Sequence, residues 1–215
     1  WKKPLQWNRA VEKAFTAWNI MVRSAGGEQR ALDLGLIKPR RLRVFCARLA
    51  DVFEDWKGPI TDHEGKTLGI YRFNEDGEKQ ATMTDLRKSL FELIDATPHL
   101  DWLLLTKRPE NISRMWPVVK KHPDMDGGEA WKRENVWLGT SVENQHYADT
   151  RIPELLKCRE LSPVLFLSCE PVVGPVDLTH VVLKKSESPE RGKPDVSIDC
   201  LRGWYGTPSN DLAMI

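Results

Sequence analysis

The sequence predicts an α/β fold built on parallel strands, and two observations lead to this prediction. Four short apolar runs are continuous rather than alternating, which is typical of strands covered on both faces. These runs are residues 42–46, 102–106, 136–142 and 164–169. Segments with helical periodicity lie between them, and the repeated order of strand, helix and strand requires right-handed parallel crossovers. We therefore expect a full or partial parallel (β/α) barrel of the TIM-barrel type, or else an open doubly wound sheet.

The region before the second apolar run predicts a helix and an inserted hairpin. Residues 7–22 have helical periodicity. Their apolar face comprises Val11, Ala14, Phe15, Trp18 and Val22. Residues 54–81 are rich in turn formers, and within them KTLGIYRF is followed by Glu75–Asp76–Gly77, a pattern that favours a hairpin.

Residues 84–97 predict the helix that leads into the second run. Its apolar stripe comprises Leu86, Leu90, Leu93, Ile94 and Thr97. Thr82 and Asp85 have the spacing of a capping box, and Pro98 follows the expected end.

Two further helices are expected after the second and third runs. Residues 109–121 begin with a proline in the first turn, where the missing N–H costs nothing, and Pro117 should end or kink that helix. Residues 143–161 form the other, with Pro153 starting a new turn or breaking the helix in two. The charged segment 184–195 predicts an exposed loop.

Composition sets limits on the class of protein. The chain has 215 residues, of which 40% are hydrophobic and 29% charged, and we expect one domain over residues 1–215. No apolar run has the length of a membrane span, so we expect no membrane partner and a cytoplasmic location. The formal net charge of +1 gives no global attraction to nucleic acid. Cys46, Cys158, Cys169 and Cys200 form no Cys-x-x-Cys pair, so we expect reduced thiols and no metal site.

Polar residues follow the apolar runs, where ligands bind in parallel α/β sheets. The candidate binding residues are Asp51, Lys107, Arg108, Ser141, Glu143, Cys169 and Glu170. The adjacent cations Lys107 and Arg108 would bind an anion, or else form an ion pair with Glu170 or Glu143. Glu170 is a candidate general base, a hydrogen-bond acceptor or half of a salt bridge. Cys169 has no histidine nearby in sequence, which favours an inert thiol over a nucleophile.

Four stretches carry a resemblance to a known family. They are RVFCARLADVFEDW, LIDATPHLDWLLLTKRPENI, NVWLGTSVENQHYADTRIPELL and FLSCEPVVGPVDL. In these stretches, and over nearly its whole length, the chain resembles the phage gene-product 37 / gene-product 68 family, also called domain of unknown function 5131. Members of that family look like radical S-adenosylmethionine proteins, in which three cysteines bind an iron–sulfur cluster at the mouth of a partial parallel barrel.

The resemblance also implies that this chain is an internal fragment. The three-cysteine motif of the family is absent before Trp1, and the chain stops at Ile215, where the family continues into another strand and a Gly-Gly-Glu-Ser loop. Arg48 stands where relatives have a small residue, and would crowd the cavity or pair with Glu170. We therefore expect a barrel of radical S-adenosylmethionine type that is incomplete at both ends. S-adenosylmethionine and the cluster would belong to the full-length parent, with no cofactor in the fragment.

The preferred functional interpretation is a cofactor or substrate site at the strand ends of such an enzyme, inactive in the fragment alone. Lys107 and Arg108 would hold an anionic group, while Asp51 and Ser141 would orient loops. The first alternative is a non-redox barrel enzyme acting on a phosphorylated small molecule. The second is a nucleic-acid-binding module, in which some of the nine tryptophans would stack on bases.

Overall fold

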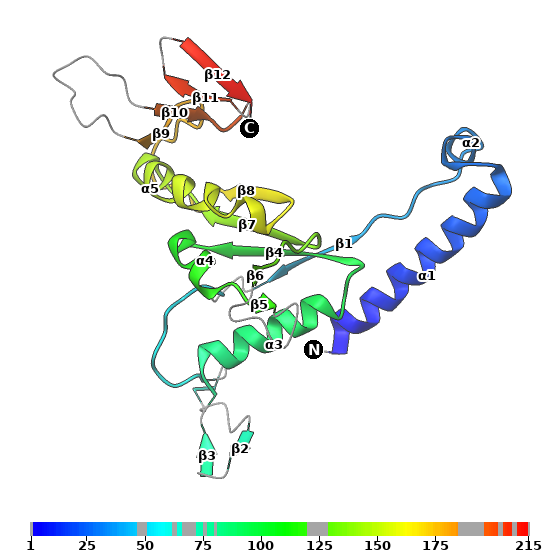
Figure 1. Cartoon of the computed structure of the whole chain (residues 1–215), viewed down its shortest axis with the longest axis horizontal. Coiled ribbons are helices and arrows are strands. Elements are labelled where there is room, and N and C mark those ends of the chain that lie inside the picture. The colour runs from blue at the N-terminus through cyan, green and yellow to red at the C-terminus, as the bar shows by residue number, and fades with distance from the viewer. Residues whose placement is uncertain are drawn as a thin grey trace. The chain divides into compact units, whose positions relative to one another are not determined.

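The computed structural model describes most of the chain, and its elements are labelled in Figure 1. The described residues are 2–46, 51–61, 64–65, 72–74, 77–79, 81–119, 129–184, 196–201, 204–207 and 210–214. None of the helices within these ranges combines the length and the apolarity that a membrane span requires.

The four apolar runs form one parallel sheet, which confirms the predicted α/β class (Figure 1). Its strands are β1 (Leu42–Cys46), β4 (Leu100–Thr106), β7 (Val136–Ser141) and β8 (Val164–Ser168). Their order in the sheet, β1-β4-β7-β8, follows their order in the chain. Closure of this sheet into a barrel stays a prediction.

The prediction that both faces of each strand are covered is confirmed for β4 and β7 and is wrong for β1 and β8. The two inner strands are almost fully buried. On β1, by contrast, Leu42 is 46% and Phe45 47% exposed, and every residue of β8 is only half-buried. The difference follows from position, because β1 and β8 are the outermost strands of this sheet. A continuous apolar run therefore does not distinguish an inner strand from an outer one.

Helix α3 (Met83–Asp95) has the predicted start and part of the predicted buried stripe, since Leu86 is only half-buried and Thr97 lies beyond the end of the helix. The Thr82 hydroxyl accepts a hydrogen bond from the Asp85 backbone N–H, and the Asp85 carboxylate accepts one from the Thr82 N–H. This reciprocal pair is the expected capping box, and it satisfies backbone donors that the first helical turn leaves unpaired. Leu90, Leu93 and Ile94 are buried, as the periodicity predicts.

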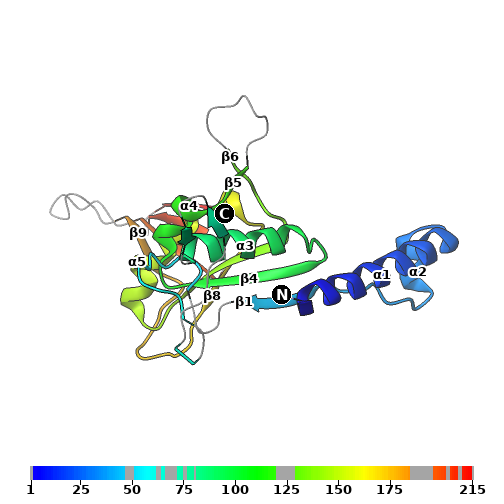
Figure 2. The same cartoon turned by 90° about the horizontal axis from the view of Figure 1, so that it is seen from below.

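The helix predicted over residues 109–121 is shorter than its predicted range. A 3₁₀ turn, η1 (Pro109–Asn111), leads into one turn of helix, α4 (Ile112–Met115), which ends before Pro117. Two short strands follow, β5 (Val118–Val119) and β6 (Glu129–Ala130), which pair in antiparallel fashion. Figure 2 shows them side by side.

Helix α5 (Gln145–Leu156) corrects one prediction, because it continues through Pro153. A proline at this position removes the hydrogen bond to the carbonyl of Asp149, and its ring crowds that carbonyl. The helix ends three residues later, and the side chains of Ala148, Ile152 and Leu155 are buried along one face. Packing of this face outweighs the loss of one backbone hydrogen bond. A second 3₁₀ turn, η2 (Arg159–Leu161), completes the connection to β8.

The N-terminal helix is longer than predicted, and less of it is buried. Helix α1 (Lys2–Ala25) buries Asn8, Val11 and Trp18, whereas Ala14, expected on the core face, is exposed. Helix α2 (Glu28–Asp33) follows. The inserted hairpin is confirmed in part: β2 (Arg72–Asn74) pairs with β3 (Gly77–Lys79) with Asn74 opposite Gly77. Residues 66–71 of the expected hairpin lie outside the described residues.

A second sheet near the C-terminus was not predicted. Strands β9 (Val181–Lys184), β10 (Val196–Asp199), β11 (Trp204–Thr207) and β12 (Asn210–Met214) form an antiparallel sheet in the order β12-β11-β10-β9. The predicted loop 184–195 overlaps this sheet at Lys184, the last residue of β9, and its other residues lie outside the described ones.

The backbone divides into two compact units. The first comprises Trp1–Cys46, Asp55–Leu103 and Arg133–Trp137, and the second Ala47–Glu54, Leu104–Lys132 and Leu138–Ile215. The candidate functional residues all belong to the second unit. The expectation of one domain stays a prediction.

Candidate functional site at the strand ends

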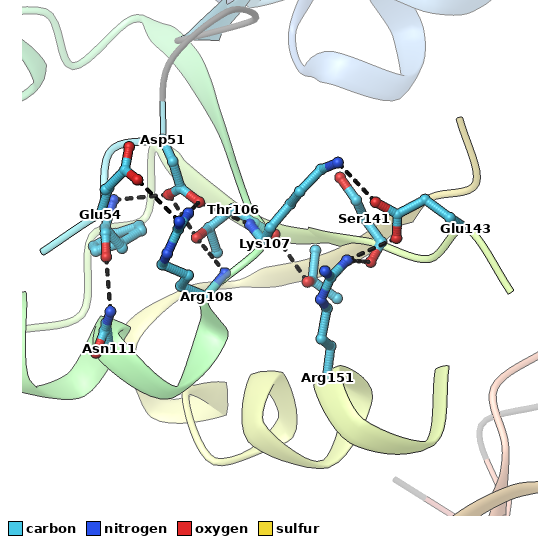
Figure 3. A network of polar contacts seen from close by, with 11 residues as sticks. Asp51, Glu54, Thr106, Lys107, Arg108, Asn111, Ser141, Glu143 and Arg151 are labelled. Carbon is cyan, nitrogen blue, oxygen red and sulfur yellow. Dashed lines mark hydrogen bonds and ion pairs between the residues drawn. The ribbon is translucent and has the colours of Figure 1, made fainter. Parts of the chain in front are cut away.

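Charged side chains from three successive strand ends form a connected network (Figure 3). Asp51 follows β1, Lys107 and Arg108 follow β4, and Glu143 follows β7. The figure shows these side chains directed toward one another, as expected when parallel strands end at the same edge of a sheet.

Asp51 organises the first half of the network as an acceptor. Its Oδ1 accepts hydrogen bonds from the Thr106 hydroxyl at 2.6 Å and from the Phe53 backbone N–H at 3.0 Å. Its Oδ2 accepts one from the Lys107 backbone N–H at 2.9 Å and contacts Nη1 of Arg108 at 3.3 Å. Only 12% of the Asp51 side chain is exposed. The carboxylate therefore links the loop after β4 to the loop after β1.

Arg108 is held from two further sides. Its Nη2 lies 2.9 Å from Oε1 of Glu54, and its backbone N–H donates to the Thr106 hydroxyl at 2.9 Å. Nearby, the Asn111 amide donates to the Phe53 carbonyl at 3.0 Å and holds η1 against the same loop. Arg108 is thus paired with two carboxylates, those of Asp51 and Glu54.

Glu143 organises the second half of the network. Its Oε1 lies 2.8 Å from Nζ of Lys107, and its Oε2 lies 2.7 Å from Nη1 of Arg151 on α5. The two cations differ in exposure, since the Lys107 side chain is 54% exposed and that of Arg151 only 14%. Nη1 of Arg151 also donates to the Ser141 carbonyl at 2.9 Å, and its guanidinium lies 3.9 Å above the Tyr147 ring.

The environment of Glu143 favours its charged form. Burial raises the pKa of this carboxyl, but the hydrogen bond from Lys107 and the positive charge of Arg151, with smaller contributions from the Glu143 backbone N–H and the Lys107 charge, lower it by more. The net result is a pKa below the ordinary value of 4.5. Glu143 therefore remains a carboxylate at neutral pH, suited to accepting hydrogen bonds.

The two halves are linked through the ends of β4 and β7. The buried Thr140 hydroxyl donates to the Thr106 carbonyl at 2.9 Å. Ser141, the next residue, is also buried, and its backbone carbonyl is the group that engages Arg151. The candidate residues Asp51, Lys107, Arg108, Ser141 and Glu143 thus lie in one network.

The end of β8 does not join this network among the described residues. Glu170 is exposed and has no hydrogen bond or ion pair there, so the ion-pair partner of Lys107 is Glu143. Cys169 is half-buried and lines a separate apolar cavity. The chain beyond Cys169 turns toward the start of α5, where the Val173 N–H donates to the Glu143 carbonyl at 2.8 Å. Arg48, the other residue considered as a partner of Glu170, lies outside the described residues.

Sequence reasoning missed Glu54, Asn111 and Arg151. Arg151 lies eight residues after Glu143, and its contact with that residue depends on how α5 is turned toward the sheet. A search for cations two helical turns into the helix after each strand would have found Arg151. No comparable spacing rule points to Glu54.

The network offers charged and hydrogen-bonding groups rather than metal ligands. Within the described ranges, no group of three or more His, Cys, Asp or Glu side chains is placed to hold a metal ion. The set Asp51, Glu54, Glu143, Lys107, Arg108 and Arg151 contains three carboxylates and three cations, which are paired with one another.

Comparison with known proteins gives one family. No curated protein and no solved structure matches this chain. One family model matches residues 72–199, more than half of the chain, including β4, β7, β8 and four of the six charged network residues. The chain therefore belongs to the family described as protein of unknown function (DUF5131).

Proposed function

We propose that this chain supplies the cofactor- or substrate-binding edge of a phage-associated enzyme of the radical S-adenosylmethionine type. The ligand lies at the carboxyl ends of β4 and β7 and carries an α-amino acid group, as S-adenosylmethionine does. The observation that carries the proposal is the ion pair between Lys107 and Glu143, in which a half-exposed ammonium meets a carboxylate that is 7% exposed.

An ion pair of this kind is complementary to a zwitterion. The ligand's carboxylate would take the place of Glu143 beside the Lys107 ammonium, and the ligand's ammonium would take the place of Lys107 beside Glu143. Lys107 can make this exchange because its side chain is long and more than half exposed.

Arg151 keeps Glu143 in place and balances its charge during this exchange. It keeps its own contact with Oε2 of Glu143, and it is held in place by the Ser141 carbonyl and the Tyr147 ring. Glu143 therefore stays fixed and charged while Lys107 moves. Arg151 acts as a positioning residue for Glu143 and leaves its Oε1 free for the ligand.

The described residues do not fit an iron–sulfur cluster. Such a cluster needs three thiolates at one place, and among the described residues no group of three or more His, Cys, Asp or Glu side chains is placed to hold a metal ion. Burial raises the pKa of Cys46 to about 11, which disfavours its thiolate form. We derive no step through a cluster, and the proposal concerns ligand binding by this chain alone.

Titration calorimetry with S-adenosylmethionine tests the proposal. We expect saturable binding to the wild-type chain and about two- to fivefold weaker binding to Lys107→Gln, because an ion pair of a half-exposed lysine contributes about 0.5–1 kcal/mol. The matched control is Lys157→Gln, since Lys157 is also exposed and also pairs with a glutamate, at 2.6 Å. Absence of binding, or equal affinity of the wild type and Lys107→Gln, contradicts the proposal.

The same titration separates the alternatives. Saturable binding of inorganic phosphate without binding of S-adenosylmethionine would favour an enzyme for a phosphorylated small molecule. Binding of single-stranded DNA that weakens steeply with salt would favour a nucleic-acid-binding module. The exposed side chains of Trp7, Trp56 and Trp131 are the available stacking surfaces for that alternative.

A further inference from the structure

We propose that the apolar cavity between α5, β8 and β10 binds an elongated apolar molecule that ends in a carboxylate, such as a medium-chain fatty acid. The cavity has a volume of about 400 Å³. It includes none of the network residues Asp51, Lys107, Arg108 or Glu143, so this inference does not depend on the proposed function.

The walls of the cavity come from separate elements and are apolar. Helix α5 contributes Ile152 and Leu155, β8 contributes Phe166, the segment before β9 contributes Leu178, and β10 contributes Ile198. Small-molecule sites are concave, measure about 300–1,000 Å³, and are lined mainly by apolar side chains with a few polar groups. Protein interiors otherwise leave few voids larger than a water molecule. Both the size and the lining of this cavity therefore match a binding site for an apolar ligand.

One cation defines the polar end of the ligand. Arg159, on η2, is the only positively charged residue in the lining, and it is exposed. Arg159 has no hydrogen-bond or ion-pair partner in the part of the chain that the structure describes. A guanidinium binds a carboxylate through two parallel hydrogen bonds. Charge complementarity thus selects an apolar acid over an alcohol or an amine of the same length.

Two thiols also line the cavity and can report its occupancy. Cys169 lies at the end of β8, and Cys200 lies just after β10. Burial and the nearby Asp199 carboxylate raise the pKa of Cys200 to about 11, so Cys200 should react slowly. Cys169 is the better reporter. Cys46 is outside the cavity lining and serves as a slow-reacting internal control, since burial raises its pKa to about 11 as well.

The first experiment measures the affinity of the full chain for octanoate, decanoate and dodecanoate by calorimetry. We expect affinity to rise by about fourfold for each CH₂ that enters the cavity, and to level off once the cavity is full. Decanol and decyltrimethylammonium should bind more weakly than decanoate. No saturable binding of any of the three acids would overturn the proposal.

The second experiment locates the ligand by alkylation with N-ethylmaleimide, read by mass spectrometry. Saturating decanoate should slow the alkylation of Cys169 and leave that of Cys46 unchanged. Equal slowing at both cysteines would overturn the assignment to this cavity. So would protection of Cys169 that rises with protein concentration and is insensitive to decanoate, because a second copy of the chain would then cover the cavity.

The third experiment tests the carboxylate. Arg159→Gln should weaken decanoate binding by roughly three- to fivefold, the effect of one solvent-exposed ion pair, without changing decanol binding. Arg9→Gln, at an exposed position on α1, is the control and should change neither. Equal binding of decanoate by the wild type and Arg159→Gln, with equally tight binding of decanol, would show that the ligand is not an acid.

Discussion

Asp51 shows how one side chain can organise the end of a sheet. Its two carboxylate oxygens meet donors from Phe53, Thr106, Lys107 and Arg108. A carboxylate that is almost fully buried is stable only when its oxygens are hydrogen-bonded. The network thus satisfies Asp51 and at the same time positions Lys107, which follows β4, for its contact with Glu143.

The substitution Asp51→Asn should destabilise the protein by about 2 kcal/mol, because the amide presents a donor to groups that are themselves donors. Urea denaturation measures the change. Asp33→Asn is the control, since Asp33 accepts one hydrogen bond on the exposed helix α2 and should change stability by less than about 0.5 kcal/mol. Equal effects of the two substitutions would contradict the role of Asp51.

The lowered pKa of Glu143 predicts how the stability of the protein changes with pH. Its pKa is lower in the folded protein than the ordinary 4.5, so its charged form stabilises the fold. This stabilisation is complete above about pH 4.5 and is lost as the pH falls through the lower pKa of the folded state. Glu143→Gln should cost about 3 kcal/mol at pH 7, because it leaves Arg151 without its carboxylate.

The difference in stability between the wild type and Glu143→Gln should therefore be constant from about pH 6 to pH 8 and shrink below about pH 4.5. Denaturation with urea across this pH range measures it. Glu160→Gln, at an exposed position after α5, should show no such dependence. A difference that grows as the pH falls would contradict the account.

At the scale of single residues, the sequence predicts which residue types lie at the candidate site better than it predicts which of them form ion pairs. The position of Lys107 and Arg108 after an apolar run predicts that they are candidate anion-binding cations, and it leaves Glu143 and Glu170 as alternative ion-pair partners. Glu170 is exposed. The choice between them depends on the course of the chain after β8, which turns toward α5, and no local pattern encodes that turn.

The central strands depend on a close approach between β7 and β8. A Cβ atom added at Gly139 would lie 2.4 Å from Cζ of Phe166 and 2.5 Å from its Cε2. The ring of Phe166 therefore packs directly over Gly139, and only glycine leaves room for it. This contact holds the outer strand β8 against the buried strand β7.

Gly139→Ala should destabilise the protein by about 2 kcal/mol through this overlap. The cost should be smaller when Phe166 is replaced by leucine, whose shorter side chain leaves space for the new methyl group. Thermal or urea denaturation of the two single variants and the double variant measures the coupling. An undiminished cost of Gly139→Ala in the Phe166→Leu background would show that the ring is not the obstacle.

Elements with strong local signals were predicted from the sequence, and elements without them were not. Helix α3 begins at a capping box that can be read from Thr82 and Asp85, and it forms where the pattern places it. Pro153 gave a misleading signal, because burial of one face of α5 outweighs its local cost. Strands β9 to β12 are short and mix apolar with polar residues. Whether such segments pair depends on the neighbouring strands as much as on their own composition.

For the molecule as a whole, the sequence predicts a class of fold and the edge of the sheet at which the charged network lies. Continuous apolar runs in the order strand, helix, strand are enough to indicate a parallel sheet, and parallel strands carry their end residues to one edge. The degree of burial of each strand could not be predicted. The sequences of β1 and β8 resemble those of inner strands, yet these strands lie at the two ends of the sheet. Sheet order is a property of the whole fold and not of any single run.

The central claim is that the residues after β4 and β7 meet at one charged edge. A double-mutant cycle between Lys107→Met and Glu143→Gln tests it most directly, with stability measured by urea denaturation at neutral pH. We predict a coupling of about 0.5–1 kcal/mol between the two positions, because the ion pair is half exposed. The matched cycle between Lys107→Met and Glu54→Gln should give a coupling near zero, since Glu54 pairs with Arg108 instead. A coupling near zero for Lys107 and Glu143 would contradict the claim.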